Sequence, residues 1–139
     1  MGLALLKMRH SMHRKPREGK LDWDNIEAAG VEDELVETII SLFKTVEAND
    51  YEAHSAFMYD PSTADLSLIG PYILAVTKLE ADQSRLSAVI DEYSLSEIST
   101  DVEIVKITML TSSTDGESSS SFDFVFIKTD GQWKLYKIQ

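Results

Sequence analysis

Two side chains in this sequence have the chemistry and the setting for proton transfer. Asp123 alternates with Val125 and Ile127, so its carboxylate shares a strand face with apolar side chains, and that setting makes a carboxylate a stronger base. His54 lies in a short predicted helix, and an imidazole can take up or release a proton near neutral pH. These two residues are the first candidates for general acid–base catalysis.

Both residues also have an ordinary structural explanation. Asp123 stands near the start of its strand, where a carboxylate is commonly solvated. A lone histidine such as His54 is more often a polar neighbour of a core edge than a proton shuttle. We expect Asp123 to be structural or solvated.

Metal and phosphate chemistry find less support. His10 and His13 can share a helix face, but no third ligand accompanies them. Residues 22–27 begin like a calcium loop, yet Ile26 stands where an oxygen ligand belongs and no glycine is next to it. The sequence has no cysteine, which excludes disulfides and thiol nucleophiles, and no glycine-rich phosphate loop. We expect no metal and no cofactor.

The first half of the chain supplies helices to position these groups. Residues 31–49 place apolar side chains three and four positions apart, with acidic residues in the first turns, and predict a helix. Asp50 can cap a short successor over residues 51–59. Residues 71–92 show similar spacing and predict one helix, or two that are broken near Asp82.

The second half changes to the two-residue period of strands. Residues 95–98 and 102–110 are predicted strands, the second rich in valine, isoleucine and threonine. The serine-rich stretch at residues 111–121 predicts a mobile loop.

A closing hairpin follows, with a turn at residues 129–132 where Asp130 and Gly131 tolerate positive φ angles. The alternation places side chains on two faces in four groups: Phe122, Phe124 and Phe126 opposite Val125 and Ile127, and Trp133 and Leu135 opposite Tyr136 and Ile138.

Charge divides the chain more sharply than its total of −11 indicates. Residues 1–20 carry six basic side chains and one acidic, a net charge of +5, whereas the remaining chain carries seven basic and 23 acidic, a net charge of −16. We expect a flexible basic leader at residues 1–20 and one domain at residues 21–139. An acidic body repels polyanions, so we expect no nucleic-acid partner.

Targeting signals are not recognised in the leader. Its apolar part is too short for a signal peptide, so a cytoplasmic location is favoured for the chain as given. The apolar runs also fall short of the roughly 20 residues that cross a bilayer, so we expect no membrane span.

The stretch VEANDYEAHSAFMYDP at residues 46–61, followed by long strands and a terminal FVFIKTDGQWKLYKI at residues 124–138, resembles the nuclear transport factor 2-like superfamily. The resemblance covers about residues 31–139 and extends to the ketosteroid isomerase-like and SnoaL-like proteins, with their cystatin-like cone. It implies an α+β fold in which N-terminal helices pack in the concave face of a curved, mostly antiparallel sheet. It also implies that the closing hairpin lies inside that sheet.

An isomerase-like site of this superfamily needs a carboxylate base and neutral acids that project into the cone. On that basis the catalytic candidates are Asp123, His54 and Tyr59, and the ligand-binding candidates are Tyr51, Tyr72 and Tyr136. None of them aligns with a catalytic motif of the family.

Two classes of function remain. We favour a non-catalytic, small acidic domain that dimerises or binds a protein partner or a small apolar ligand. The alternative is a small-molecule-binding protein or an isomerase- or cyclase-like enzyme that uses a pocket inside the cone. Because the strands are apolar on both faces and helices are expected to cover only one, we predict a homodimer through the outer sheet face.

Overall fold

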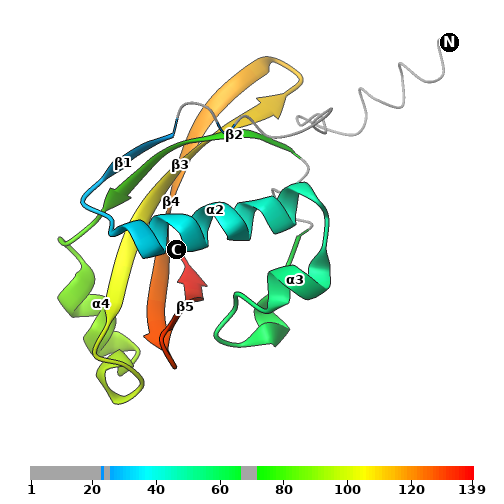
Figure 1. The fold of residues 1–139 in the computed structure, drawn as a ribbon. Helices are drawn as coiled ribbons and strands as arrows, with labels where there is room; N and C mark the ends of the chain where they lie inside the picture. Colours follow the sequence, from blue (N-terminus) through cyan, green and yellow to red (C-terminus); the bar gives the residue numbers. More distant parts are fainter. Residues whose placement is uncertain (1–22, 24–25, 67–71) are drawn as a thin grey trace, which may run out of the picture.

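The structure, a computed structural model, describes residues 23, 26–66 and 72–139. These residues form an α+β fold with one five-stranded sheet (Figure 1). The elements are β1 (Glu27–Ala29), α2 (Asp33–Glu47), α3 (Tyr51–Ser55), the 3₁₀ helix η1 (Pro61–Thr63), β2 (Ile73–Ala81), α4 (Leu86–Glu92), the 3₁₀ helix η3 (Leu95–Glu97), β3 (Val102–Ser113), β4 (Gly116–Thr129) and β5 (Gln132–Ile138). The predicted flexible leader at residues 1–20 and the His10 and His13 pair, for which no metal is expected, lie outside the described residues.

The sheet has the strand order β1-β2-β3-β4-β5. β1 pairs with β2 in parallel, and every other pair is antiparallel, so the sheet is mixed. Within the described part of the chain, no helix is long and apolar enough to cross a membrane.

The two helices predicted before Pro61 are confirmed. α2 buries Leu35, Ile39, Leu42 and Phe43 along one stripe. It ends where Asn49 adopts a left-handed φ of 54°. Asp50 then caps α3, since its side chain accepts a hydrogen bond of 3.1 Å from the Ala53 backbone N–H. The caps and the stripe are local signals, which explains why the sequence predicts them well.

The helix predicted from residue 71 is wrong over 73–81, which form β2. The pairing of β2 with β3 shifts between Ile73 and Ala75 and again between Val76 and Lys78. Each shift is a β-bulge that adds one residue to the strand. Ile73, Val76 and Leu79 therefore bury their side chains in the same core although they are three residues apart. Two bulges give a strand the spacing of a helix.

The predicted strand at residues 95–98 is also wrong. Ser94 adopts a left-handed φ of 52°, and the chain continues as η3. Leu95 is 0% exposed and packs with Val89 of α4. Of the two alternatives left open for residues 71–92, one helix or two broken near Asp82, neither holds in full: β2 ends at Ala81, and only the second helix forms, as α4 from Leu86.

The serine-rich stretch forms strands instead of the predicted loop. β3 runs to Ser113 and β4 starts at Gly116, so only two residues make the turn. Side chains bridge the two strands: the Thr108 and Ser121 hydroxyls lie 2.8 Å apart, and those of Thr111 and Ser118 lie 3.2 Å apart. Backbone pairing with a neighbouring strand decides the conformation here, and composition does not.

The closing hairpin is confirmed, with φ angles of 52° at Asp130 and 78° at Gly131 in its turn. β4 is an inner strand, but β5 lies at the end of the strand order, so the implied position of the hairpin inside the sheet is wrong for β5. Residues 57–59 cover part of this edge. The Leu135 N–H donates to the Phe57 carbonyl at 2.8 Å, and the Tyr59 N–H donates to the Leu135 carbonyl at 2.9 Å.

The pairing of β5 with β4 shifts at Tyr136, the extra residue of another bulge. Simple alternation places Tyr136 and Ile138 on the same face, opposite Leu135. Instead, Ile138 pairs with Phe124 and shares its face. The prediction for Ile138 is therefore wrong.

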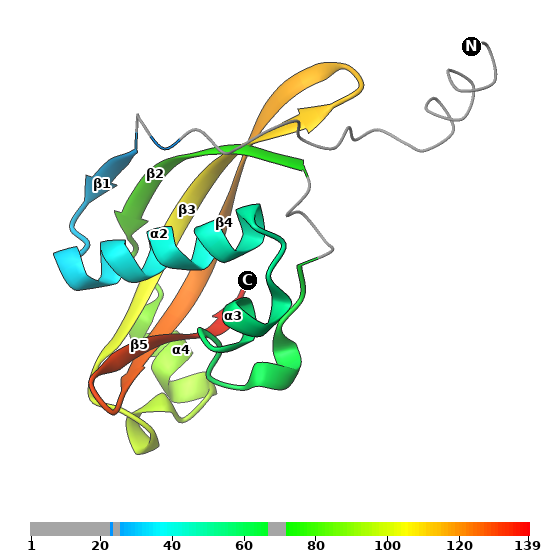
Figure 2. The same ribbon diagram turned by 45° about the vertical axis from the view of Figure 1, so that its right-hand side comes forward.

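Helical elements cover both faces of the sheet. Figure 2 shows α2 in front of the strands and α4 behind them. The core behind the sheet joins α4 and η3 to β3 and β4 through Val89, Leu95, Val102, Ile104, Val125 and Ile127. The expectation that helices cover only one face, on which the homodimer was based, is wrong in this region. The homodimer itself stays a prediction.

Candidate functional site

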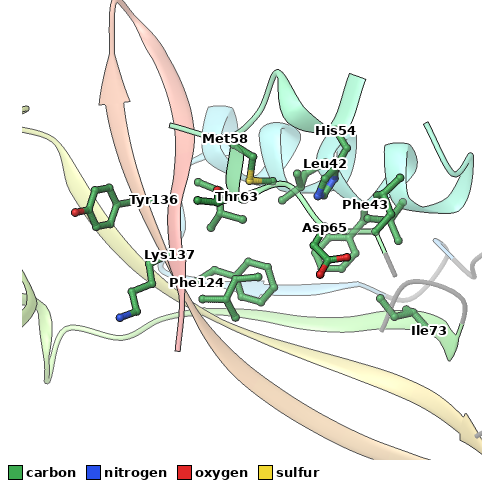
Figure 3. A pocket seen from close by; sticks show the side chains of 14 residues that line it. Leu42, Phe43, His54, Met58, Thr63, Asp65, Ile73, Phe124, Tyr136 and Lys137 are labelled. Atoms are coloured by element: carbon green, nitrogen blue, oxygen red, sulfur yellow. The ribbon is translucent and has the colours of Figure 1, made fainter. Parts of the chain in front are cut away.

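A cavity of about 280 Å³ lies between α2, the segment from α3 to η1 and the sheet (Figure 3). Its lining comes from α2 (Leu42, Phe43, Val46), from α3 and the chain after it (His54, Met58, Thr63, Asp65, Leu66) and from the strands (Ile73, Phe124, Leu135, Tyr136, Lys137, Ile138). Most of these side chains are apolar, and the few polar ones come from different elements.

Local structure directs the apolar side chains into this space. The last two turns of α2 contribute Leu42, Phe43 and Val46, which follow the three- and four-residue spacing of one helix face. From the sheet, Phe124 contacts Phe43 with ring centroids 5.9 Å apart. The β5 bulge brings Ile138 opposite Phe124 and thereby to the same cavity.

His54 is the buried polar residue of the lining. It is 6% exposed, and its Nδ1 lies 3.1 Å from the Thr45 hydroxyl at the end of α2. Burial lowers the pKa of His54 below its ordinary value of 6.5, and the nearby charge of Asp65 opposes that shift. The imidazole is therefore neutral at physiological pH.

Asp65 and Lys137 are the charged residues of the lining. Both side chains are exposed, and Figure 3 shows them at different ends of the lining. The Lys137 ammonium donates a hydrogen bond to the Tyr93 hydroxyl, and this bond raises the pKa of Lys137. The Tyr136 ring contacts both Tyr59 and Tyr93, with centroids 5.7 and 5.8 Å away. An aromatic group thus borders the cavity on the β5 side.

Asp123, the first catalytic candidate, does not line the cavity. It lies on β4 beside Phe124 but points to the opposite face, because neighbouring residues of a strand alternate. Its carboxylate is 18% exposed and lies 3.8 Å from the Arg85 guanidinium just before α4. The structure therefore separates Asp123 from His54 by the full thickness of the sheet.

Only one of the four tyrosine candidates lies at the cavity. Tyr136 lines the cavity, whereas Tyr51, Tyr59 and Tyr72 are not part of its lining. Tyr51 and Tyr59 are 54% and 42% exposed, and Tyr72 is half-buried just before β2. Of the six candidate residues, the structure brings only His54 and Tyr136 to the same cavity.

Sequence reasoning missed the rest of the lining. The α2 residues were predicted to be core, since a helical stripe does not reveal whether it faces side chains or open space. Asp65 and Lys137 have no motif around them, and Ile138 reaches the cavity face through a bulge that the sequence does not mark. The one available signal was His54, a histidine beside apolar residues in a capped helix.

Among the described residues, no group of three or more His, Cys, Asp or Glu side chains is placed to hold a metal ion. No protein-family model, curated protein or solved structure matches this chain. The site must therefore be interpreted from its own geometry.

Proposed function

We propose that this chain is a ligand-binding domain whose cavity takes a small, mostly apolar molecule. The observation that carries the proposal is the cavity itself: space beside buried apolar side chains of α2 and the sheet, with one buried polar group, His54. Binding sites for small molecules share this combination of apolar walls with few polar groups that orient the ligand.

The volume sets the size of the ligand. An apolar cavity of about 150 Å³ binds benzene. A cavity of about 280 Å³ has room for a molecule of two fused rings. Flat aromatic or alicyclic compounds of that size match the space between the Phe43 and Phe124 rings on one side and Met58 on the other.

We propose binding without a reaction, because no described residue of the cavity is placed to act as a strong base. Asp123, the candidate base, lies on the other face of the sheet, and Asp65 is exposed to water, which does not favour a strong carboxylate base. The neutral His54 supports a role in orienting a ligand.

We infer that the sheet is curved, that α2 packs in its concave face and that the fold is nuclear transport factor 2-like. The bulges in β2 and β5 support curvature, since bulges bend strands and increase their twist. A cavity at one end of the α2 face fits such a cone.

Methyl-detected NMR of the full chain, titrated with naphthalene-sized probes, tests the proposal. Methyl signals of the cavity residues Val46, Ile73 and Leu135 should shift on addition of 2-methoxynaphthalene, while those of Val89 and Leu95 in the core behind the sheet should not. Absence of shifts at the cavity methyls, or equal shifts in both groups, would refute the proposal.

A matched pair of α2 variants adds a second test. Val46→Phe puts a ring into the cavity and should weaken binding by about tenfold or more, because the ring occupies the ligand's space. Ser41→Phe adds the same ring on the exposed side of the same helix and should leave binding unchanged. Equal affinity in the two variants would place the binding site elsewhere.

A further inference from the structure

The hydroxyl of Thr45 has two neighbours that together determine where its proton goes. Its Oγ1 lies 2.6 Å from the Leu42 carbonyl oxygen and 3.1 Å from His54 Nδ1. A carbonyl oxygen can only accept, so the single hydroxyl proton is donated to Leu42. Toward His54, the Thr45 oxygen is left as an acceptor.

His54 Nδ1 must then be the donor in its contact with Thr45. A neutral imidazole carries one N–H, so its Nε2 has no proton and is a hydrogen-bond acceptor. The lowered pKa keeps the ring neutral at physiological pH. Thr45 therefore sets the tautomer of a residue that lines the cavity, although Thr45 is not itself among the lining residues.

The described residues leave the Nε2 atom of His54 without a hydrogen bond. No hydrogen bond joins it to any residue in the part of the chain that the structure describes. In that same part, no buried side-chain nitrogen or oxygen lacks a partner, so Nε2 is not sealed in the core. His54 is a lining residue that is only 6% exposed, and from this we infer that Nε2 faces the cavity.

We propose that the cavity selects ligands that carry a hydrogen-bond donor, an O–H or N–H group on an apolar ring system, which Nε2 of His54 accepts. This inference rests on the proposed function and names the chemical class of its ligand. Phenols and indole-like compounds belong to that class; ethers and ketones of the same size do not.

Charge near the site favours the same class. Asp65 is the titratable group that faces His54 from the chain after α3, and its negative charge repels anions and attracts the positive end of an O–H or N–H dipole. On the β5 side, the Lys137 ammonium is held by the Tyr93 hydroxyl. Beside His54, the charge of Asp65 therefore favours a neutral donor over a carboxylate.

Binding of 2-naphthol and 2-methoxynaphthalene to the full chain tests the inference, since the two probes share a ring system and an oxygen but only the first has a donor. The wild type should bind 2-naphthol roughly fivefold more tightly, as expected for one neutral hydrogen bond. His54→Phe keeps a ring at the position and should remove this preference.

Thr45→Val is the second variant, because it keeps the shape of the side chain and leaves every lining residue in place. Without the Thr45 acceptor, the proton can move to Nε2, so the preference for 2-naphthol should fall or reverse. The nitrogen chemical shifts of His54, measured by NMR without ligand, should show Nδ1 protonated in the wild type and a mixture of tautomers in Thr45→Val.

The outcomes separate the two proposals. Equal binding of both probes by the wild type, an unchanged preference in His54→Phe, or a protonated Nε2 in the wild type would overturn this inference while the ligand-binding function stands. Failure of both probes to bind would overturn the proposed function, and this inference with it.

Discussion

The two faces of the sheet are built from the same strands but are covered in different ways. On one face, the long helix α2 crosses the strands and leaves a cavity of about 280 Å³ beside its C-terminal end. On the other, the short elements α4 and η3 bury Val89 and Leu95 at 1% and 0% exposure. Because neighbouring strands of a sheet are rotated relative to one another, a long straight helix packs closely against only part of the sheet. Two short elements can each pack closely against the strands beneath them.

This contrast between an open and a closed face has consequences for stability. Side chains on the closed face have neighbours on all sides, so any change in side-chain volume lowers the free energy of unfolding. Side chains that line the cavity have free space on one side, so a change in their size should lower the free energy of unfolding less.

Leu95→Ala is expected to produce the largest effect. Leu95 is fully buried on the closed face, and truncation of such a leucine costs about 2–5 kcal/mol in the free energy of unfolding. Urea unfolding followed by circular dichroism measures the loss. A cost below about 1 kcal/mol would mean that the closed face relaxes easily and that the contrast between the faces is wrong.

A pair of valine-to-leucine variants tests the contrast directly. Val89→Leu on α4 overfills the closed face and should cost about 1–3 kcal/mol. Val46→Leu on α2 extends into the cavity and should be neutral or stabilising. Both substitutions change helix propensity in the same way, so the difference between their unfolding free energies reports packing alone. Equal costs would contradict an open α2 face.

The free energy of unfolding should depend on pH because the pKa of His54 differs between the folded and the unfolded chain. Its pKa in the folded chain is below the 6.5 of the unfolded chain, so between these two values the unfolded chain binds more protons. Stability should therefore decline as the pH falls below about 6.5. Asp65 opposes the shift and therefore limits the decline.

His54→Phe is the control for this pH effect. In urea unfolding at several pH values, the wild type should lose stability relative to the variant as the pH falls from 7 to 5. Parallel curves would show that His54 does not titrate differently in the two states.

Glu103→Gln should give the smallest effect, with the opposite pH dependence. Burial raises the pKa of Glu103 above 4.5, and the charges of Glu32 and Asp101 raise it further. The folded chain then holds its proton more tightly, so this group's contribution to stability falls as the pH rises through that range. The variant should be more stable than the wild type at pH 7 by a few tenths of a kcal/mol, roughly the size of surface charge effects.

The gain from Glu103→Gln should shrink as the pH falls below 4.5, where the wild-type carboxyl group becomes protonated in both states. Thermal unfolding at pH 7 and pH 4 measures the difference. A variant that is less stable at pH 7 would show that the Glu103 carboxylate makes a favourable contact.

The sequence by itself determined the elements whose signals are local. The α2 stripe, the Asp50 cap, the Asp130–Gly131 turn and the alternation along β4 all depend on residues close together in the chain. Helix periodicity, capping and turn preferences act over a few residues, so their outcome can be predicted without knowing the rest of the fold.

Only the tertiary structure decided features that depend on the register between strands. The bulges of β2 gave that strand a helical spacing, and the bulge of β5 moved Ile138 to the cavity side. None of these bulges is marked in the sequence, because a bulge depends on the register with the partner strand.

The candidate site was predictable only in part for the same reason. His54 was found because of its chemistry, but its place in a cavity and the tautomer set by Thr45 arise from the packing of α2 against α3. Asp123 had equally suggestive neighbours in the chain, yet strand alternation sends its carboxylate to the other face. Residue type determines what chemistry is available, and long-range packing decides which groups meet.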